Sequence, residues 1–127
     1  MKPSISPLTK HPFIAEYADD IKLELHLAAT NAANDMLHRT GGDNGACGFA
    51  WVTIHPEHKG NTKAGKAERR AFEALGAKKD YTGKAWEIWK PGSVHVQSVL
   101  VLEAGAEAAA KVLKGFGLDA YGNSRLD

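Results

Sequence analysis

The sequence contains a single cysteine, Cys47, among its 127 residues. One thiol excludes an internal disulfide framework and any site built on a CxxC pair, and it favours a reducing compartment. Because cysteine is among the most often buried residue types, we expect the Cys47 thiol to be packed rather than catalytic. The chain also lacks a run of about 18 apolar residues, so no membrane span is expected. Its first residues lack the apolar core of a signal peptide, which argues against secretion.

Net charge is nearly absent as well, since 16 basic and 15 acidic residues give +1. That balance excludes the broad basic surface that binds nucleic acid through its phosphates. The charge is unevenly placed, because residues 59–90 hold nine basic and four acidic residues, a net +5, and the remainder is −4. Cations with Tyr81, Trp86 and Trp89 nearby suit a small ligand that bears both a phosphate and a base. The alternative is a solvated helix face whose charges only maintain solubility.

Hydrophobic periodicity predicts an α+β fold of one domain spanning residues 1–127. After an irregular, proline-containing lead-in over residues 1–12, apolar residues recur every three or four positions from Phe13 to Arg39, which predicts a long helix. Further helices are expected within residues 59–80 and over 98–114, and strands over 49–54, 84–89 and 118–121. The resulting order, α-β-α-β-α-β, gives a small, few-stranded sheet packed against the long N-terminal helix and two further helices.

Signatures of catalysis are lacking. The segment 55–58 (HPEH) places two histidines and a carboxylate together. Zinc needs three or four such ligands in ordered spacing, however, and the other histidines form no matching second half. GxSxG, HExxH and phosphate-loop patterns do not occur. We therefore expect no metal, no other cofactor and no enzymatic activity.

The last six residues, 122–127 (GNSRLD), combine unusual chemistry for a chain end. Asn123, Arg125 and Asp127 bring an amide, a guanidinium and a carboxylate, which can hydrogen bond to ribose hydroxyls and phosphate oxygens. We expect a functional tail here. The alternatives are an intrachain pair between Arg125 and the terminal carboxylates, and a contact between copies of the chain.

Four stretches resemble a widespread family of small tailed-bacteriophage proteins. They are residues 47–52 (CGFAWV), 81–89 (YTGKAWEIW), 102–106 (LEAGA) and 120–127 (AYGNSRLD), and the match covers about residues 20–127. The chain also resembles the first-described anti-Thoeris sponge family, whose members are oligomeric phage proteins that capture cyclic ADP-ribose isomers, and in some cases cyclic oligonucleotides, without chemical change. This resemblance implies a non-catalytic protein, in the cytoplasm of the infected bacterial host, that sequesters a cyclic nucleotide immune signal.

These observations together predict a homo-oligomer that binds a small phosphorylated nucleotide in a pocket between subunits. The expected ligand-binding residues are Arg125, Asn123 and Asp127 from the tail, Trp86 as a stacking face, and Lys84, Arg39 or Arg69 for phosphate. The alternative is a phage structural or nucleic-acid-associated protein without a small-molecule ligand, whose residues 59–90 lie on DNA or a virion partner. An enzyme is a third hypothesis, supported only by Cys47, the histidines and scattered acids.

Overall fold

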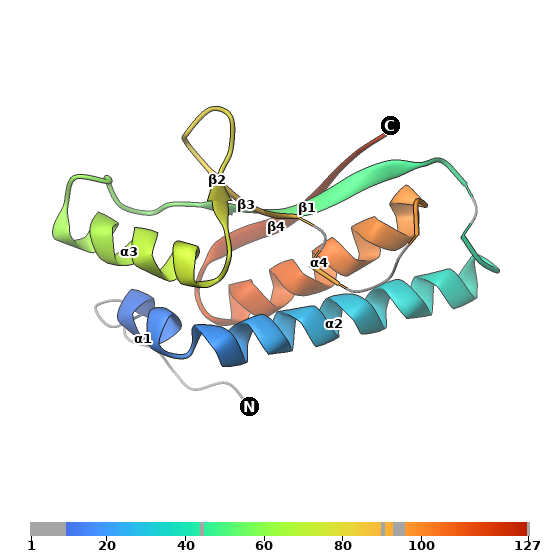
Figure 1. Cartoon of the computed structure of the whole chain (residues 1–127), viewed down its shortest axis with the longest axis horizontal. Coiled ribbons are helices and arrows are strands. Elements are labelled where there is room, and N and C mark those ends of the chain that lie inside the picture. The colour runs from blue at the N-terminus through green and yellow to red at the C-terminus, as the bar shows by residue number, and fades with distance from the viewer. Residues whose placement is uncertain (1–9, 44, 90, 93–95, 127) are drawn as a thin grey trace.

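A computed structural model of the chain describes residues 10–43, 45–89, 91–92 and 96–126. The elements of these ranges, in order, are α1 (Lys10–Glu16), α2 (Ala18–Arg39), β1 (Gly48–His55), α3 (Lys63–Ala74), β2 (Lys78–Lys79), β3 (Trp86–Trp89), α4 (Val99–Gly115) and β4 (Asp119–Leu126) (Figure 1). The expected α+β class is therefore confirmed. The structure adds a short strand, β2, and divides the N-terminal helix in two.

The strands form one antiparallel sheet in the order β2-β3-β1-β4. Its centre is β1, in which Ala50, Val52 and Ile54 are buried, as expected for alternate positions that face a core. Figure 1 shows α2 and α4 together on one side of the sheet. We call that side the inner face, and the side on which the other positions of β1 lie the outer face.

Small residues bring the helices close to one another and to the sheet. At Gly105 of α4, an added Cβ would lie 3.2 Å from the carbonyl oxygen of Ala29 in α2. At Gly122 of β4, an added Cβ would lie 3.0 Å from the backbone nitrogen of Glu107 in α4. Glycine thus allows backbone to approach backbone at both positions, where a larger residue would force a small shift.

The N-terminal segment differs from the prediction of an irregular lead-in followed by one helix. Helix α1 begins at Lys10, with Pro12 in its first turn, where a missing N–H donor removes no intrahelical hydrogen bond. The helix axis is interrupted at Tyr17, yet the Tyr17 N–H still donates to the Phe13 carbonyl at 3.0 Å. The remaining lead-in, residues 1–9, lies outside the described residues.

The C-terminal segment, expected as a short strand followed by a tail, is one long strand. Every residue of β4 has a partner on β1, from Gly48 opposite Leu126 to His55 opposite Asp119. The sequence of this segment is polar and contains glycine, so its own β-propensity is low. Pairing along the whole of the central strand overrides that propensity. Asp127 lies outside the described residues.

The α3 and α4 helices agree with the prediction within a few residues. The Thr62 side chain accepts a hydrogen bond from the Gly65 N–H at 3.0 Å and so caps α3, as expected from its position. Ser98 precedes α4 at the N-cap position but makes no side-chain cap bond. No helix among the described residues is both long and apolar enough to cross a membrane.

Candidate functional site

The outer face of the sheet carries a group of aromatic side chains. Phe49 and Trp51 come from β1, and Trp89 of β3 stands directly opposite Trp51 in the antiparallel register. The rings of Trp51 and Trp89 are stacked, with centroids 4.6 Å apart and planes 19° apart. Phe49 meets Trp89 edge to face at 6.3 Å. Trp89 remains 46% exposed, so part of its indole is accessible to a ligand.

Strand β4 adds two polar side chains beside these rings. Arg125 stands opposite Phe49, with its guanidinium carbon 5.4 Å from the ring centroid. Asn123 stands opposite Trp51, and its side-chain oxygen accepts a hydrogen bond from the Ser124 N–H at 3.0 Å. The amide NH2 of Asn123 is therefore the group that can donate to a ligand. We call Phe49, Trp51, Trp89, Asn123 and Arg125 the aromatic patch.

The chemistry of the aromatic patch is that of a stacking surface with one fixed cation. Aromatic faces accept any flat base, and a guanidinium that lies on a ring keeps its N–H donors at its edges for phosphate or carboxylate oxygens. Next to the patch, His55 Nε2 and the Tyr121 hydroxyl are 3.0 Å apart. Polar groups thus continue along the outer face on one side of the rings.

Two of the expected binding residues, Asn123 and Arg125, belong to the aromatic patch, but the expected stacking residue Trp86 does not. Trp86 is only 7% exposed and packs against Phe72 of α3, with ring centroids 5.5 Å apart. Its register partner is Ile54, a core residue on the inner face. The prediction of Trp86 as a stacking face is therefore wrong, because strand alternation places Trp86 inside and Trp89 outside.

The expected phosphate-binding residues do not gather around the tail within one chain. Arg39 and Arg69 each pair with a carboxylate four residues away on the same helix, at 3.0 and 2.9 Å. Lys84 lies exposed just before β3. Lys84 lies two residues before Trp86, which stands opposite Ile54, whereas Arg125 stands opposite Phe49. Phe49 and Ile54 are about 16 Å apart along β1 at the rise of a strand.

Sequence reasoning missed Phe49 and Trp51 as site residues, although it placed them on a strand. The strand is apolar on both faces, a pattern typical of a strand that is covered on both sides, and such a pattern gives no signal of a binding face. The expected burial of Cys47 is also wrong. Its thiol is exposed, 3.6 Å from the side-chain oxygen of Gln97.

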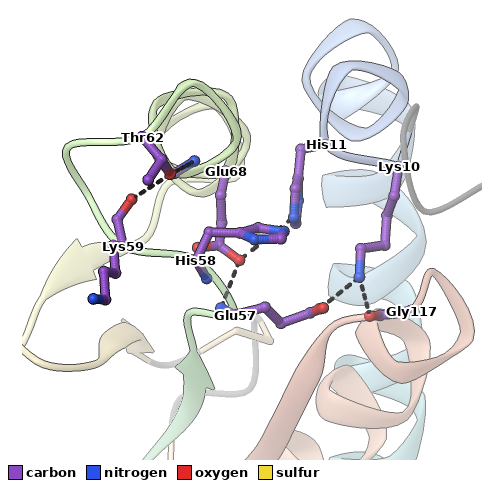
Figure 2. Close-up of polar contacts among 9 residues, drawn as sticks. Lys10, His11, Glu57, His58, Lys59, Thr62, Glu68 and Gly117 are labelled. Atoms are coloured by element: carbon purple, nitrogen blue, oxygen red, sulfur yellow. Dashed lines mark hydrogen bonds and ion pairs between the residues drawn. The ribbon is translucent and has the colours of Figure 1, made fainter.

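A second cluster of polar side chains lies where α1 and α3 meet. His11 comes from the first turn of α1, His58 from the loop after β1, and Glu68 from α3 (Figure 2). One potential metal-ligating atom from each residue lies within 4.8 Å of the other two. The expectation that the segment 55–58 has no matching second half is wrong, because the fold brings His11 and Glu68 to His58.

Burial dominates the electrostatics of this cluster. His11 and Glu68 are 3% and 2% exposed. Desolvation lowers the pKa of His11 below its ordinary value, and the nearby Glu68 carboxylate only partly opposes that shift. At the rim, the hydrogen bond from the Lys10 ammonium lowers the pKa of Glu57. The cluster therefore presents a neutral imidazole at pH 7 beside an ion pair of Lys10 and Glu57.

Comparison with known proteins identifies no relative: no protein family, curated protein or solved structure matches the chain. The indications of function are therefore the aromatic patch and the cluster of His11, His58 and Glu68.

Proposed function

We propose that this protein is a non-catalytic, phage-encoded binding protein that sequesters a cyclic nucleotide immune signal, a cyclic ADP-ribose isomer or a cyclic oligonucleotide, and so blocks host defence. The observation that carries the proposal is the stacked pair of Trp51 and Trp89, flanked by Arg125 and Asn123, on the outer face of the sheet. Such a ligand offers a flat base, ribose hydroxyls and phosphates, and the patch has a matching group for each.

The interactions that one aromatic patch can make support only weak binding. Stacking of one base on an aromatic side chain contributes about 1–3 kcal/mol. A charge-assisted hydrogen bond from a guanidinium to phosphate contributes about 1.5–3 kcal/mol. Together these give about 2.5–6 kcal/mol, which corresponds to dissociation constants between about ten millimolar and tens of micromolar. Capture of a dilute signal therefore needs more contacts than one patch supplies.

A second copy of the chain is the simplest source of those contacts. The aromatic patch is a surface of a sheet rather than an enclosed cleft, and tight ligand sites usually bury most of the ligand. Trp89 is 46% exposed and Tyr121, on the same face of the sheet, is 39% exposed, so aromatic surface remains there for a second copy to cover. A two-fold arrangement of two outer faces would enclose a ligand between two patches, in line with the expected homo-oligomer.

The alternative function, a nucleic-acid-associated phage protein, uses the same geometry differently. Antiparallel sheets whose open face carries aromatic residues bind single strands by base stacking. A polymer, however, requires cations along its backbone as well. On the outer face, Lys78 stands opposite the carboxylate of Glu87 in register, which offsets its charge. This charge pattern favours a small ligand over a strand.

Binding is tested with the purified full-length chain. We expect isothermal titration calorimetry to detect a cyclic ADP-ribose isomer, a cyclic dinucleotide or a cyclic trinucleotide, and mass spectrometry to recover that ligand unchanged. Arg125→Gln should weaken binding at least tenfold, since it removes the charge and the guanidinium donors while keeping a polar side chain. Arg69→Gln is the matched control, because Arg69 is also an exposed arginine and pairs with Glu73 outside the patch, and this variant should bind like the wild type.

Three results would contradict the proposal. No heat and no thermal shift with any of these ligands at millimolar concentration would remove the small-molecule hypothesis. Equal losses in Arg125→Gln and Arg69→Gln would show that binding does not use the aromatic patch. Binding of single-stranded oligonucleotides that falls steeply between 50 and 200 mM salt would instead favour the nucleic-acid alternative, as counterion release predicts.

A further inference from the structure

We propose that His11, His58 and Glu68 form a binding site for one Zn²⁺ ion, which joins α1 to α3 and to the loop between β1 and α3. The site is separate from the aromatic patch and does not depend on the proposed nucleotide function. Two imidazole nitrogens and one carboxylate oxygen are a donor set that zinc prefers.

The distance between the two buried ligands fits a tetrahedral zinc ion. Zinc lies about 2.0–2.2 Å from imidazole nitrogen and carboxylate oxygen, so two ligands at a tetrahedral angle are about 3.4 Å apart. His11 Nε2 and Glu68 Oε2 are 3.4 Å apart. The ligating atom of His58 lies within 4.8 Å of both, and the His58 side chain is exposed. A shift of its ring by about 1.4 Å or less would complete three ligands.

The buried ring of His11 is an independent indication of a missing partner. Among the described residues, no atom makes a hydrogen bond to either ring nitrogen of His11, although the residue is 3% exposed. The contact of Nε2 with Glu68 has the distance of an ion pair but lacks hydrogen-bond geometry. Buried polar nitrogens are nearly always paired. A metal ion between His11 and Glu68 would satisfy Nε2.

The surroundings hold the ligands in place. The Glu68 carboxylate accepts hydrogen bonds from the backbone N–H of Glu57 at 2.7 Å and of His58 at 3.3 Å (Figure 2). Each carboxylate oxygen keeps a lone pair for a metal, and hydrogen bonds of this kind orient metal-binding carboxylates. The ring of His11 is fixed by edge contacts with His58 and Phe72, at 5.7 and 6.3 Å.

A cavity borders the two histidines, and we expect the fourth coordination position to open toward it. This cavity has a volume of about 550 Å³ and is lined by Lys10, Pro12 and Lys63 beside the two histidines. Three protein ligands with an open position are typical of zinc sites that bind water or an exchangeable anion. Glu57, which also lines the cavity, is paired with Lys10, so Lys63 adds the net positive charge that favours an anion over a cation in that position.

The test uses the full-length protein, stripped with EDTA and titrated with ZnCl₂ against a chromophoric competitor. We expect one zinc ion per chain, bound at micromolar concentration or below. Zinc at 100 times its dissociation constant should raise the melting temperature by about 10 °C for a chain of this length. MgCl₂ should have no effect, because Mg²⁺ prefers oxygen ligands alone.

Variants separate this site from adventitious binding. His58→Ala removes an exposed ligand and should weaken zinc binding at least tenfold while leaving the circular dichroism spectrum unchanged. His38→Ala removes an exposed histidine on α2 and should bind zinc like the wild type. Glu68→Gln should also lose zinc, and if this buried variant fails to fold, His58→Ala still decides. No saturable binding at 100 µM zinc, normal binding by His58→Ala, or an equal loss in His38→Ala would each overturn the proposal.

Discussion

The two tryptophans of β3 offer a quantitative test of which face of the sheet is available for binding. Trp86 is 7% exposed and lies in the core, whereas Trp89 is 46% exposed on the outer face. Truncation of a buried tryptophan costs about 3–5 kcal/mol. Trp89 hides about half of its surface, so Trp89→Ala should cost about half as much, roughly 1.5–2.5 kcal/mol, including its stacking on Trp51.

Thermal unfolding followed by circular dichroism measures this difference without relying on tryptophan fluorescence. At an unfolding entropy of about 2.1 cal/mol/K per residue, each kcal/mol lowers the melting temperature by about 4 °C in a chain of 127 residues. We therefore expect a fall of about 11–19 °C for Trp86→Ala and about 6–9 °C for Trp89→Ala. A domain with a stability of 5–15 kcal/mol should tolerate the second change and remain folded at 25 °C.

Substitutions of Trp89 and Trp86 should also differ in their effect on ligand binding. Trp89→Ala should weaken nucleotide binding by roughly 5- to 150-fold, the equivalent of one lost stacking contact. Trp86→Phe, which preserves most of the core volume, should leave binding unchanged. If Trp86→Phe abolishes binding and Trp89→Ala does not, the assignment of the two faces is refuted. Equal destabilisation by the two alanine variants would refute it as well.

Three further predictions concern the fold, and each is checked by urea unfolding. Thr62→Ala removes the cap bond to Gly65 and should cost about 1 kcal/mol, whereas Thr62→Ser should cost less. Gly122→Ala places a Cβ 3.0 Å from the backbone of Glu107 and should cost about 1–3 kcal/mol; no loss would show that α4 can shift from β4. Hydrogen bonds within its turn lower the pKa of Asp80, so its carboxylate stabilises the fold above its unfolded pKa, near 4, and this contribution is lost as the pH falls through the lower folded pKa. Asp80→Ala should accordingly be less stable than the wild type at pH 7, and the difference should shrink as the pH falls below about 4 toward the folded pKa of Asp80.

Local patterns in the sequence were sufficient to predict most of the fold. The aromatic and β-branched residues of 49–54 predicted β1, and the alanine-rich segment after Ser98 predicted α4. The strand β2 could not be predicted, because its two residues, Lys78 and Lys79, have little strand preference. They form a strand because they pair with Glu87 and Trp86 of β3. The extent of β4 was equally hidden, since it depends on pairing with a distant segment rather than on its own composition.

The sites were less predictable than the fold because they depend on long-range pairing. Arg125 and Asn123 were identified by their chemistry, but their neighbours are fixed by the register of β4 on β1. His11 and His58 lie 47 positions apart, and no spacing rule connects them. Their proximity follows from the packing of α1 against α3, which brings the start of α1 to the loop after β1.

The two sites lie at opposite ends of the same strand, which gives the proposals separate consequences. The aromatic patch uses Phe49 and Trp51 in the first half of β1, whereas the loop with His58 begins after β1 ends at His55. Since His55 is paired with Asp119 and its ring contacts Tyr121, the end of β1 is fixed by β4 whether or not zinc is bound. Zinc should therefore stabilise the protein without changing nucleotide affinity by more than about twofold. A larger effect of zinc on that affinity would mean that the end of β1 moves when the metal binds, and that the two sites are coupled through the central strand.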